Sequence, residues 1–394
     1  MKEISKVKAY IKKSIHSILG ERHILKSIHH NFITNLYFSF QDKDYLYLII
    51  DYFSGGDLRF YLNKNVQFNE KQIKFLISNL ILSLKYLHKN NILHRDIKPE
   101  NLVFDEKGYL NLADFGISKI IQENKAIKDR SGTPGYLSPE IISKKNQTFV
   151  SDYFPIGIII HELIFLKRPF NGKNRQEVLD QILHKNIKLK KNNLPILFLN
   201  SSSANDLIDF INRLLKRKAE ERLGSKGIFE IIEHPWLKDI DWDIMEDKLF
   251  KEEEIPFIPC QGDNFDFLKV NKNINEKDIN YNSYLKLINS STLFNNFYFN
   301  SFSSNRKVLS SSNLYHKKIS DPNENNSKII HCQTLKNNKK NIKNDTKNES
   351  DDSGEYTLSE YNNEEDDFSF KSEDNERKSG EIKRKRHSLS PKKN

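Results

Sequence analysis

The sequence contains few cysteines and no long hydrophobic run. Cys260 and Cys332 are the only cysteines among 394 residues, far apart and without metal-ligand spacing. This pattern supports neither a disulfide framework nor a zinc site, and it favours a reducing compartment. No apolar run approaches the roughly 18 residues that a membrane span needs, and the basic start lacks the apolar core and cleavage site of a signal peptide. We expect an intracellular, cytoplasmic protein with no membrane span.

A nucleic-acid-binding motif is also missing. The formal net charge of +10 invites such a function, but the lysines are scattered through Asn- and Ile-rich sequence. They do not gather on one aromatic-bearing motif. We interpret the charge as mostly solvated surface and expect no nucleic-acid partner.

Apolar periodicity divides the chain into a folded part and a tail. Residues 46–53 (LYLIIDYF) predict a buried strand, and residues 70–91 show helical apolar spacing. Three later segments also have helical spacing: SDYFPIGIIIHELIFLKRPF, RQEVLDQILHK and SANDLIDFINRLLKR. After about residue 270 the composition changes to Asn, Ser, Lys and acidic residues, which cannot bury enough apolar surface to offset chain entropy. We predict disorder there, and the chain shows no repeats.

The stretch NILHRDIKPENLVFDEKGYLNLADFGISK at 91–119 carries the chemistry. Asp96 and Asp114 fall in short loops beside apolar segments, accompanied by Lys98 and Asn101. One carboxylate can orient an attacking hydroxyl, while the other and an amide oxygen suit Mg²⁺, which prefers oxygen ligands. A lysine balances phosphate charge. This set favours phosphoryl transfer, in which catalysis is mostly positioning and charge neutralisation.

The same stretch resembles the catalytic loop and DFG motif of eukaryotic protein kinases, with Ile97 in place of the usual leucine. Three further segments resemble the AGC group of serine/threonine kinases: DKDYLYLIIDYFSGGDLRFYL, SGTPGYLSPEII, and HPWLKDIDWDIM followed by IPFIP and DNFDF. The resemblance covers about residues 1–270 and is most specific over 46–170.

The resemblance implies an α+β fold, the two-lobe protein kinase fold. The kinase domain would span 1–236, with a small β lobe at about 1–50 and a mainly α-helical large lobe at about 54–236. An AGC-like C-terminal tail would follow at 237–300, and a disordered low-complexity tail at 301–394.

The resemblance also implies ATP and Mg²⁺ as cofactors. Asp96 would be the catalytic aspartate, Lys98 would contact the γ-phosphate, and Asn101 and Asp114 would bind Mg²⁺. The predicted nucleotide contacts are Lys2, Glu21, Ile50, Asp51, Phe53, Asp57, Glu100, Asn101 and Asp114.

The start of the chain raises a question about activity. Lys2 and Glu21 are nineteen residues apart, which agrees with the spacing of the family's ATP lysine and its partner glutamate. Lys2 could also be one lysine among many near a terminus. The Gly-rich loop and two strands that should precede Lys2 are absent, so the small lobe would be incomplete. Either the true protein is longer, or this form is an impaired kinase or kinase-fold scaffold; retention of the loop aspartates and the DFG glycine favours the enzyme.

Three further residues have expected structural roles in the large lobe. Glu140, at the end of SPE, would pair with Arg222 in a buried ion pair. Asp152 would hold the backbone of the catalytic loop. Pro155 is expected in the first turn of the following helix, where proline is tolerated.

A set of stacked core residues is expected from Leu25, Leu36, His94 and Phe115.

The activation segment at 114–140 departs from the group's pattern. Many AGC kinases carry a phosphorylated threonine where this chain has Asp129. A fixed carboxylate could pair with Arg95 and order the segment without phosphorylation, with one charge in place of nearly two. The alternative is an exposed polar loop residue. Thr133 would favour Ser/Thr acceptors over Tyr.

Substrate preference follows from three acids near the acceptor site. Asp57, Glu100 and Glu162 match positions at which basophilic AGC kinases hold arginines upstream of the acceptor. We therefore expect protein substrates with basic motifs, although each acid alone could be ordinary surface charge. We expect a monomer with a regulatory tail.

The tail contains an aromatic motif and two charged blocks. FNNFYF resembles the AGC hydrophobic motif, so Phe294 and Phe297 would dock on the small lobe, with Tyr298 in place of the usual Ser/Thr or acidic residue; a chance cluster is the alternative. The acidic block ESDDSGEYTLSEYNNEEDDFSFKSEDNE precedes the basic RKSGEIKRKRHSLSPKK. The basic block could be a nuclear localisation signal, a pseudo-substrate bearing Ser388 and Ser390, or a plain solvated tail.

Overall fold

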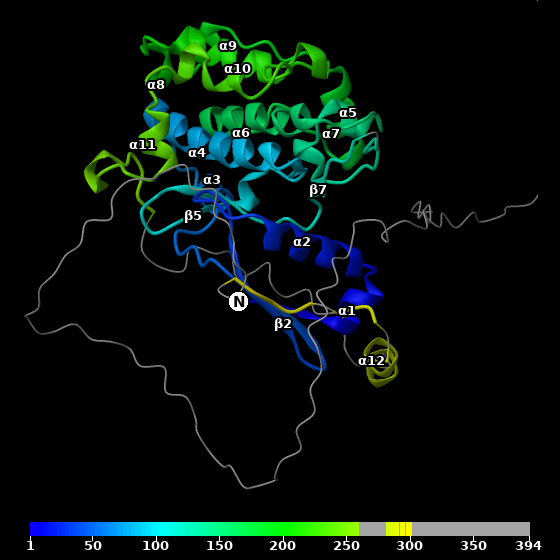
Figure 1. Ribbon diagram of the computed structural model, residues 1–394. Helices are drawn as coiled ribbons and strands as arrows, with labels where there is room; N and C mark the ends of the chain where they lie inside the picture. The colour runs from blue at the N-terminus through cyan, green and yellow to red at the C-terminus, as the bar shows by residue number, and fades with distance from the viewer. Residues whose placement is uncertain (124, 260–280, 291, 296, 302–394) are drawn as a thin grey trace, which may run out of the picture. The chain divides into compact units, whose positions relative to one another are not determined.

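The computed structural model describes residues 1–123, 125–259, 281–290, 292–295 and 297–301 (Figure 1). Both cysteines, Ser388, Ser390 and nearly all of the tail predicted to be disordered lie outside these residues. Within the described ranges, none of the helices combines the length and the hydropathy that a membrane crossing requires.

The small lobe is a four-stranded antiparallel sheet with helices packed beside it. The strand order is β1-β3-β2-β8, so the last strand in sequence lies at one edge. The elements of this lobe are β1 (Lys2–Ser5), α1 (Lys6–Ile11), α2 (Ile15–Ser27), β2 (Leu36–Gln41), β3 (Tyr45–Ile50), α12 (Tyr281–Asn289) and β8 (Phe299–Asn300).

The predicted strand at 46–53 forms, but it ends earlier. Leu46 and Leu48 point into the core and are fully buried, as the period of two in a half-buried strand requires. β3 ends at Ile50, opposite Leu36, because β2 begins there and offers no further partner. The following Asp51 N–H donates instead to the Asn35 carbonyl, 3.1 Å away.

The C-terminal aromatic motif docks on the small lobe, as predicted. β8 pairs with β2, Ser39 Oγ donates to the Phe297 carbonyl at 2.6 Å, and Gln41 Nε2 donates to the Phe294 carbonyl at 2.9 Å. Both phenylalanine side chains are buried. Because β8 covers the edge of β2, backbone groups that would otherwise face solvent are paired.

The large lobe is mainly helical, as predicted, with two small two-stranded sheets, β4-β7 and β5-β6. Its elements are α3 (Leu58–Asn63), α4 (Glu70–Lys89), β4 (Ile92–Leu93), β5 (Leu102–Phe104), β6 (Leu110–Leu112), β7 (Lys119–Ile120), α5 (Pro139–Ile142), α6 (Phe154–Phe165), α7 (Arg175–His184), α8 (Ile196–Leu199), α9 (Ala204–Leu214), α10 (Phe229–Ile232) and α11 (Trp242–Glu246).

Two long helices, α4 and α6, lie side by side in this lobe (Figure 1). α4 begins at a reciprocal capping box, in which Asn69 and Gln72 each accept from the other's backbone N–H. In α6, Pro155 occupies the first turn, where backbone N–H groups have no partner within the helix, so the missing N–H of proline costs no helical hydrogen bond. Gly157 lets α6 approach α9 closely, because a Cβ there would lie 2.9 Å from the Leu215 side chain.

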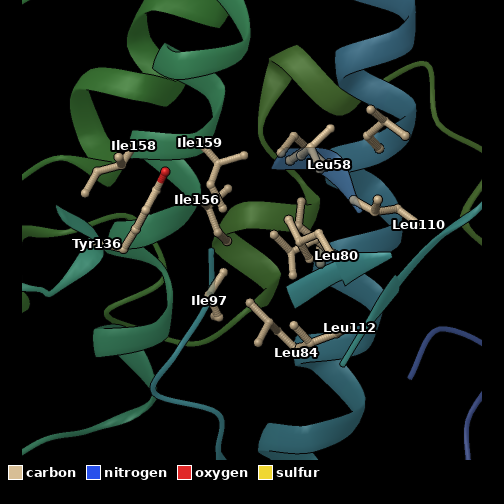
Figure 2. Close-up of a cluster of buried hydrophobic side chains, with 14 of the residues drawn as sticks. Leu58, Leu80, Leu84, Ile97, Leu110, Leu112, Tyr136, Ile156, Ile158 and Ile159 are labelled. Carbon is tan, nitrogen blue, oxygen red and sulfur yellow. The ribbon is translucent and has the colours of Figure 1, made fainter. Parts of the chain in front are cut away.

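The core between these helices anchors the loop that contains Asp96. Figure 2 shows Ile97 among side chains of α4, α6 and β6. Ile97 is almost completely buried, and so are Leu84, Leu112 and Ile156 in the same cluster. Since Ile97 directly follows Asp96, burial of the isoleucine restrains the position of the aspartate.

The expected ion pair between Glu140 and Arg222 is confirmed. Arg222 donates from Nη1 and Nη2 to the two carboxylate oxygens at 2.7 and 2.9 Å, and its side chain is fully buried. Arg222 Nε and Nη1 also donate to the carbonyls of Lys216 and Val150. This bidentate pair joins α5 to the chain after α9.

Truncation of the docking aromatic should destabilise the small lobe. We expect Phe297→Ala to lower the free energy of unfolding by about 3–5 kcal/mol, because a fully buried ring is lost and a cavity remains. Denaturant unfolding of the whole chain measures this loss. Tyr298→Ala is the control, since the neighbouring side chain is 68% exposed; the docking has no energetic weight if both variants unfold alike.

Candidate active site

The loop at residues 94–98, here called the aspartate loop, is held by a buried carboxylate. Asp152 accepts hydrogen bonds from the backbone N–H groups of His94 and Arg95, both at 2.9 Å, and contacts His88 Nε2 at 3.0 Å. Arg95 has φ +72°, an unfavourable conformation for a side chain of its kind. The predicted anchoring role of Asp152 is confirmed, and it stabilises this conformation.

Asp96 lies at the centre of a three-residue cluster. Its Oδ2 accepts from Lys98 Nζ at 2.5 Å, and its Oδ1 accepts from Thr133 Oγ1 at 2.7 Å. Lys98 Nζ also donates to Thr133 Oγ1 at 2.9 Å. The aspartate loop and the segment before α5 therefore meet at one carboxylate.

The cluster controls the charge of Asp96. Burial by itself would raise the pKa of Asp96, but the hydrogen bonds from Lys98 and Thr133 and the lysine charge lower it below its ordinary value. Asp96 is thus ionised at neutral pH. It can accept a hydrogen bond from a hydroxyl, as it already does from Thr133.

Asn101 and Asp114 come from adjacent segments. Asn101 Nδ2 donates to the Asp96 carbonyl at 2.8 Å and to Asp96 Oδ2 at 3.1 Å, and the Ala113 N–H donates to the Asn101 carbonyl at 2.8 Å. Asp114 is exposed and has φ +65°. An amide oxygen and one carboxylate fit Mg²⁺, which usually keeps several waters and binds substrate phosphates. No group of three or more His, Cys, Asp or Glu with metal-binding geometry occurs among the described residues.

Lys2 and Glu21 form the predicted contact. Lys2 Nζ lies 2.7 and 2.8 Å from the two carboxylate oxygens of Glu21. Burial raises the pKa of Glu21, and the Lys2 charge only partly offsets this. The pair joins the edge strand β1 to α2.

The predicted nucleotide contacts Ile50, Asp51 and Phe53 lie at the end of β3 and just after it. The Asp51 carboxylate accepts from the Asn35 backbone N–H at 2.9 Å and from Tyr37 Oη at 2.6 Å. The hydrogen bond to Asp51 raises the pKa of Tyr37 to about 12. The Asp51 side chain thus holds the connection between the lobes, which leaves backbone groups as its means of binding a ligand.

The three predicted acids do not act alike. The Asp57 carboxylate caps α3 by accepting from the Phe60 N–H at 2.8 Å. Glu100 and Glu162 are brought together, and both bind Arg59. Sequence reasoning missed Arg59. The only signal was its place two residues after Asp57, since no local spacing connects it with the two glutamates.

The predicted contact between Asp129 and Arg95 is confirmed. Arg95 Nη2 donates to Asp129, which also accepts from Lys119 Nζ at 3.0 Å and from Ser131 Oγ at 2.8 Å. Burial raises the pKa of Asp129, but the hydrogen bond and charge of Arg95 reverse this and leave the pKa well below its ordinary value. Asp129 therefore joins the segment before Thr133 to the aspartate loop.

Of the predicted stack of core residues, one ring contact is observed. The rings of His94 and Phe115 meet edge to face with centroids 5.1 Å apart. Leu25, on α2, and Leu36, on β2, are both buried. The ring contact joins the aspartate loop to the residue that follows Asp114, while the stacking of Leu25 and Leu36 on these rings stays a prediction.

Comparison with known proteins agrees with this geometry. Residues 1–237 match the protein kinase domain family. A probable serine/threonine-protein kinase of Dictyostelium discoideum is 39% identical over 260 residues, which are 66% of this chain and 54% of that protein. The serine/threonine-protein kinase sgk-1 of Caenorhabditis elegans is 35% identical over 287 residues, 72% of this chain and 59% of its own length. The cAMP-dependent protein kinase catalytic subunit of Schizosaccharomyces pombe is 38% identical over 261 residues, which are 66% of this chain and 48% of that protein. The chain spans about half the length of these curated relatives.

Removal of the Asp129 carboxylate should loosen the segment that it joins to the aspartate loop. In Asp129→Ala, we expect amide hydrogen exchange of residues 127–133 to accelerate by about tenfold or more, because a buried Arg95 guanidinium loses its charged partner. Hydrogen exchange with mass spectrometry measures this in the unphosphorylated protein. Lys128→Ala, an exposed substitution next to it, is the control; equal exchange in both variants would show that Asp129 does not order the segment.

Proposed function

Because the chain belongs to the protein kinase family, with relatives in its AGC group of serine/threonine kinases, we propose that it transfers the γ-phosphate of ATP to serine or threonine hydroxyls of protein substrates. The observation that carries this proposal is the cluster of Asp96, Lys98 and Thr133 beside Asn101. It places an ionised carboxylate, a cation and a hydroxyl-binding geometry at one point, as phosphoryl transfer requires.

In this proposal, Asp96 orients the substrate hydroxyl and accepts its proton. The new bond forms between the hydroxyl oxygen and the γ-phosphorus, while the bond from that phosphorus to the β-γ bridging oxygen of ATP breaks. Lys98, 2.5 Å from Asp96, balances charge on the transferring group. Thr133 donates to the carboxylate oxygen that would receive the substrate hydroxyl, which supports a preference for Ser/Thr acceptors.

The proposed nucleotide site lies between the lobes. Lys2, oriented by Glu21, would bind the α- and β-phosphates, and backbone groups near Asp51 and Phe53 would meet the adenine. Asn101 and Asp114 would hold Mg²⁺, which neutralises phosphate charge when bound. The support is the contact of Lys2 with Glu21 and the hydrogen bond that joins the Asn101 and Asp114 segments.

We further propose that the segment before Thr133 does not need phosphorylation to become ordered. Asp129 supplies the negative charge that Arg95 and Lys119 bind. The docked tail strand β8 would act on the chain's own small lobe, which suits a monomer.

Recognition of basic substrates would depend on Glu100 and Glu162. Bidentate pairing with carboxylates is the strongest way to bind a substrate guanidinium. Both glutamates, however, already bind Arg59. A preference for basic substrates therefore requires that Arg59 release the two glutamates.

Kinase activity should depend on the two aspartates. With Mg²⁺, radiolabelled ATP and a degenerate Ser/Thr peptide library, we expect phosphorylation by the whole chain and a loss of about 100-fold or more in Asp96→Asn and in Asp114→Asn. Asp243→Asn, at an exposed residue of α11, is the control. Binding of ATP without phosphorylation would instead support a kinase-fold scaffold, and equal labelling by the wild type and Asp96→Asn would reveal a contaminant.

The Lys2–Glu21 pair should make ATP binding depend on pH. Because the pKa of Glu21 is raised, its charge is present at higher pH and is lost as pH falls through the raised value, while Asp96 remains ionised. We expect Glu21→Gln to bind Mg²⁺-ATP about tenfold more weakly than the wild type at neutral pH. That ratio should shrink toward one in acid.

Isothermal titration from about pH 8 to about pH 5 measures the ratio, which cancels the titration of the nucleotide itself. Glu3→Gln, at an exposed residue of the same strand, should match the wild type throughout. A ratio that stays constant over this range would separate Glu21 from ATP binding.

A further inference from the structure

A guanidinium of the chain itself lies in the acidic cluster beside the candidate active site. Arg59 Nε donates to Glu100 Oε1 at 2.9 Å, and Nη1 and Nη2 donate to the two oxygens of Glu162 at 2.8 and 3.3 Å. Nη2 also donates to the hydroxyl of Tyr136. All three nitrogens of Arg59 are therefore bonded within this cluster.

The cluster lies beside the point where a substrate would react. Glu100 is four residues from Asp96, so their Cα atoms are at most about 14 Å apart. Tyr136 is three residues from Thr133, which donates to Asp96, and this tyrosine packs beside α6, the helix that carries Glu162 (Figure 2). A peptide whose hydroxyl reaches Asp96 would thus bring residues near its acceptor within side-chain reach of Glu100 and Glu162.

Burial and charge hold the Arg59 guanidinium between the two glutamates. The side chains of Arg59 and Glu162 are 16% and 7% exposed, while that of Glu100 is 40% exposed. Burial lowers the pKa of Arg59, but the hydrogen bond and charge of Glu162 more than reverse this, so the guanidinium stays charged. Arg59 is also fixed at its backbone, because it follows the Asp57 cap in the first turn of α3.

A second guanidinium has little left to bind in this arrangement. An incoming arginine would need to displace Arg59 and then replace hydrogen bonds that a side chain of the protein already makes to both oxygens of Glu162. If Arg59 stays in place, the newcomer would meet a like charge at a partly buried site. Both routes cost free energy that a neutral substrate residue avoids.

We infer that Arg59 fills, from within the chain, the carboxylate site that would otherwise bind a substrate arginine, and that it is a specificity-determining residue. The wild-type chain then does not select arginine at the upstream position that faces Glu100 and Glu162. Loss of Arg59 converts the same site into one that does. This inference rests on the proposed kinase function and revises the basic preference expected from the carboxylates.

Peptide binding tests the inference without requiring catalysis. The probes are neutral peptides with alanine at the acceptor and a single arginine moved through each upstream position, each compared with the peptide that carries uncharged citrulline there. Fluorescence polarisation measures their affinities for the wild type, Arg59→Gln, Arg59→Lys and the control Arg175→Gln. Arg175 is an exposed arginine at the start of α7, so Arg175→Gln removes the same charge as Arg59→Gln.

We expect the wild type and Arg175→Gln to bind arginine and citrulline peptides within about threefold of each other at every position. Arg59→Gln should prefer arginine by about tenfold or more at one position, since the buried Glu162 carboxylate regains a bidentate partner. Adding Glu162→Gln to Arg59→Gln should abolish that preference. A purely structural Arg59 would change unfolding free energies but not the ratio of the two peptides.

Several results would overturn the inference. One is a tenfold preference of the wild type for the arginine peptide over the citrulline peptide, if Glu162→Gln removes that preference. This result can be obtained without any Arg59 variant. Another is an unchanged ratio in a folded Arg59→Gln. If Arg59→Gln does not fold, Arg59→Lys takes its place, because it keeps the charge but loses the bidentate fork and should show an intermediate arginine preference; a ratio equal to that of the wild type would count against the inference.

The same peptides with serine at the acceptor, incubated with Mg²⁺ and ATP, test the proposed function separately. Absence of phosphate transfer would reject the kinase activity, while the binding ratios would still decide the role of Arg59. Phosphorylation with a wild-type arginine preference would keep the kinase and reject the inference.

Discussion

The buried carboxylate of Asp152 is the contact on which the candidate site depends. It accepts from the N–H groups of His94 and Arg95 and so fixes the backbone just before Asp96. Arg95 adopts a conformation that its side chain disfavours, so the loop needs such an external partner to persist. Burial of Ile97 on the other side of Asp96 completes the restraint. The Asp96 carboxylate is thus held from both directions without a ligand, and such preorganisation is what the proposed phosphoryl transfer would require.

Carboxylate–arginine pairs recur in this lobe, and their surroundings decide what each can do. Arg222 is fully buried with Glu140, so this pair holds the fold together and has no access to a ligand. Asp129 is 41% exposed and meets Arg95 at the edge of the site, so it can order a segment in place of a modification. Arg59 lies between a buried and an exposed glutamate, and this intermediate placement is the basis of its proposed role in substrate selection.

The small lobe shows how a distant segment completes a local structure. β1, β2 and β3 form a sheet near the start of the chain, but the free edge of β2 is covered by β8 from the tail. Two hydrogen bonds from β2 side chains and two buried phenylalanines hold that strand. Since α2 carries Glu21 and packs on the same sheet, the tail also supports the partner of Lys2.

The sequence by itself determined the family and most of the folded framework. Asp96, Lys98 and Asn101 lie within one short loop, where the order of residues dictates their proximity, and the periods of the long helices follow from their apolar spacing. The ends and partners of strands were harder to predict from the sequence, because β3 ends where its neighbour β2 begins. The role of the acids near the active site was decided only by the tertiary structure. Arg59 comes from a separate helix, and its charge reaches Glu162 only after the chain has folded, so no local pattern in the sequence shows that both glutamates already bind an arginine.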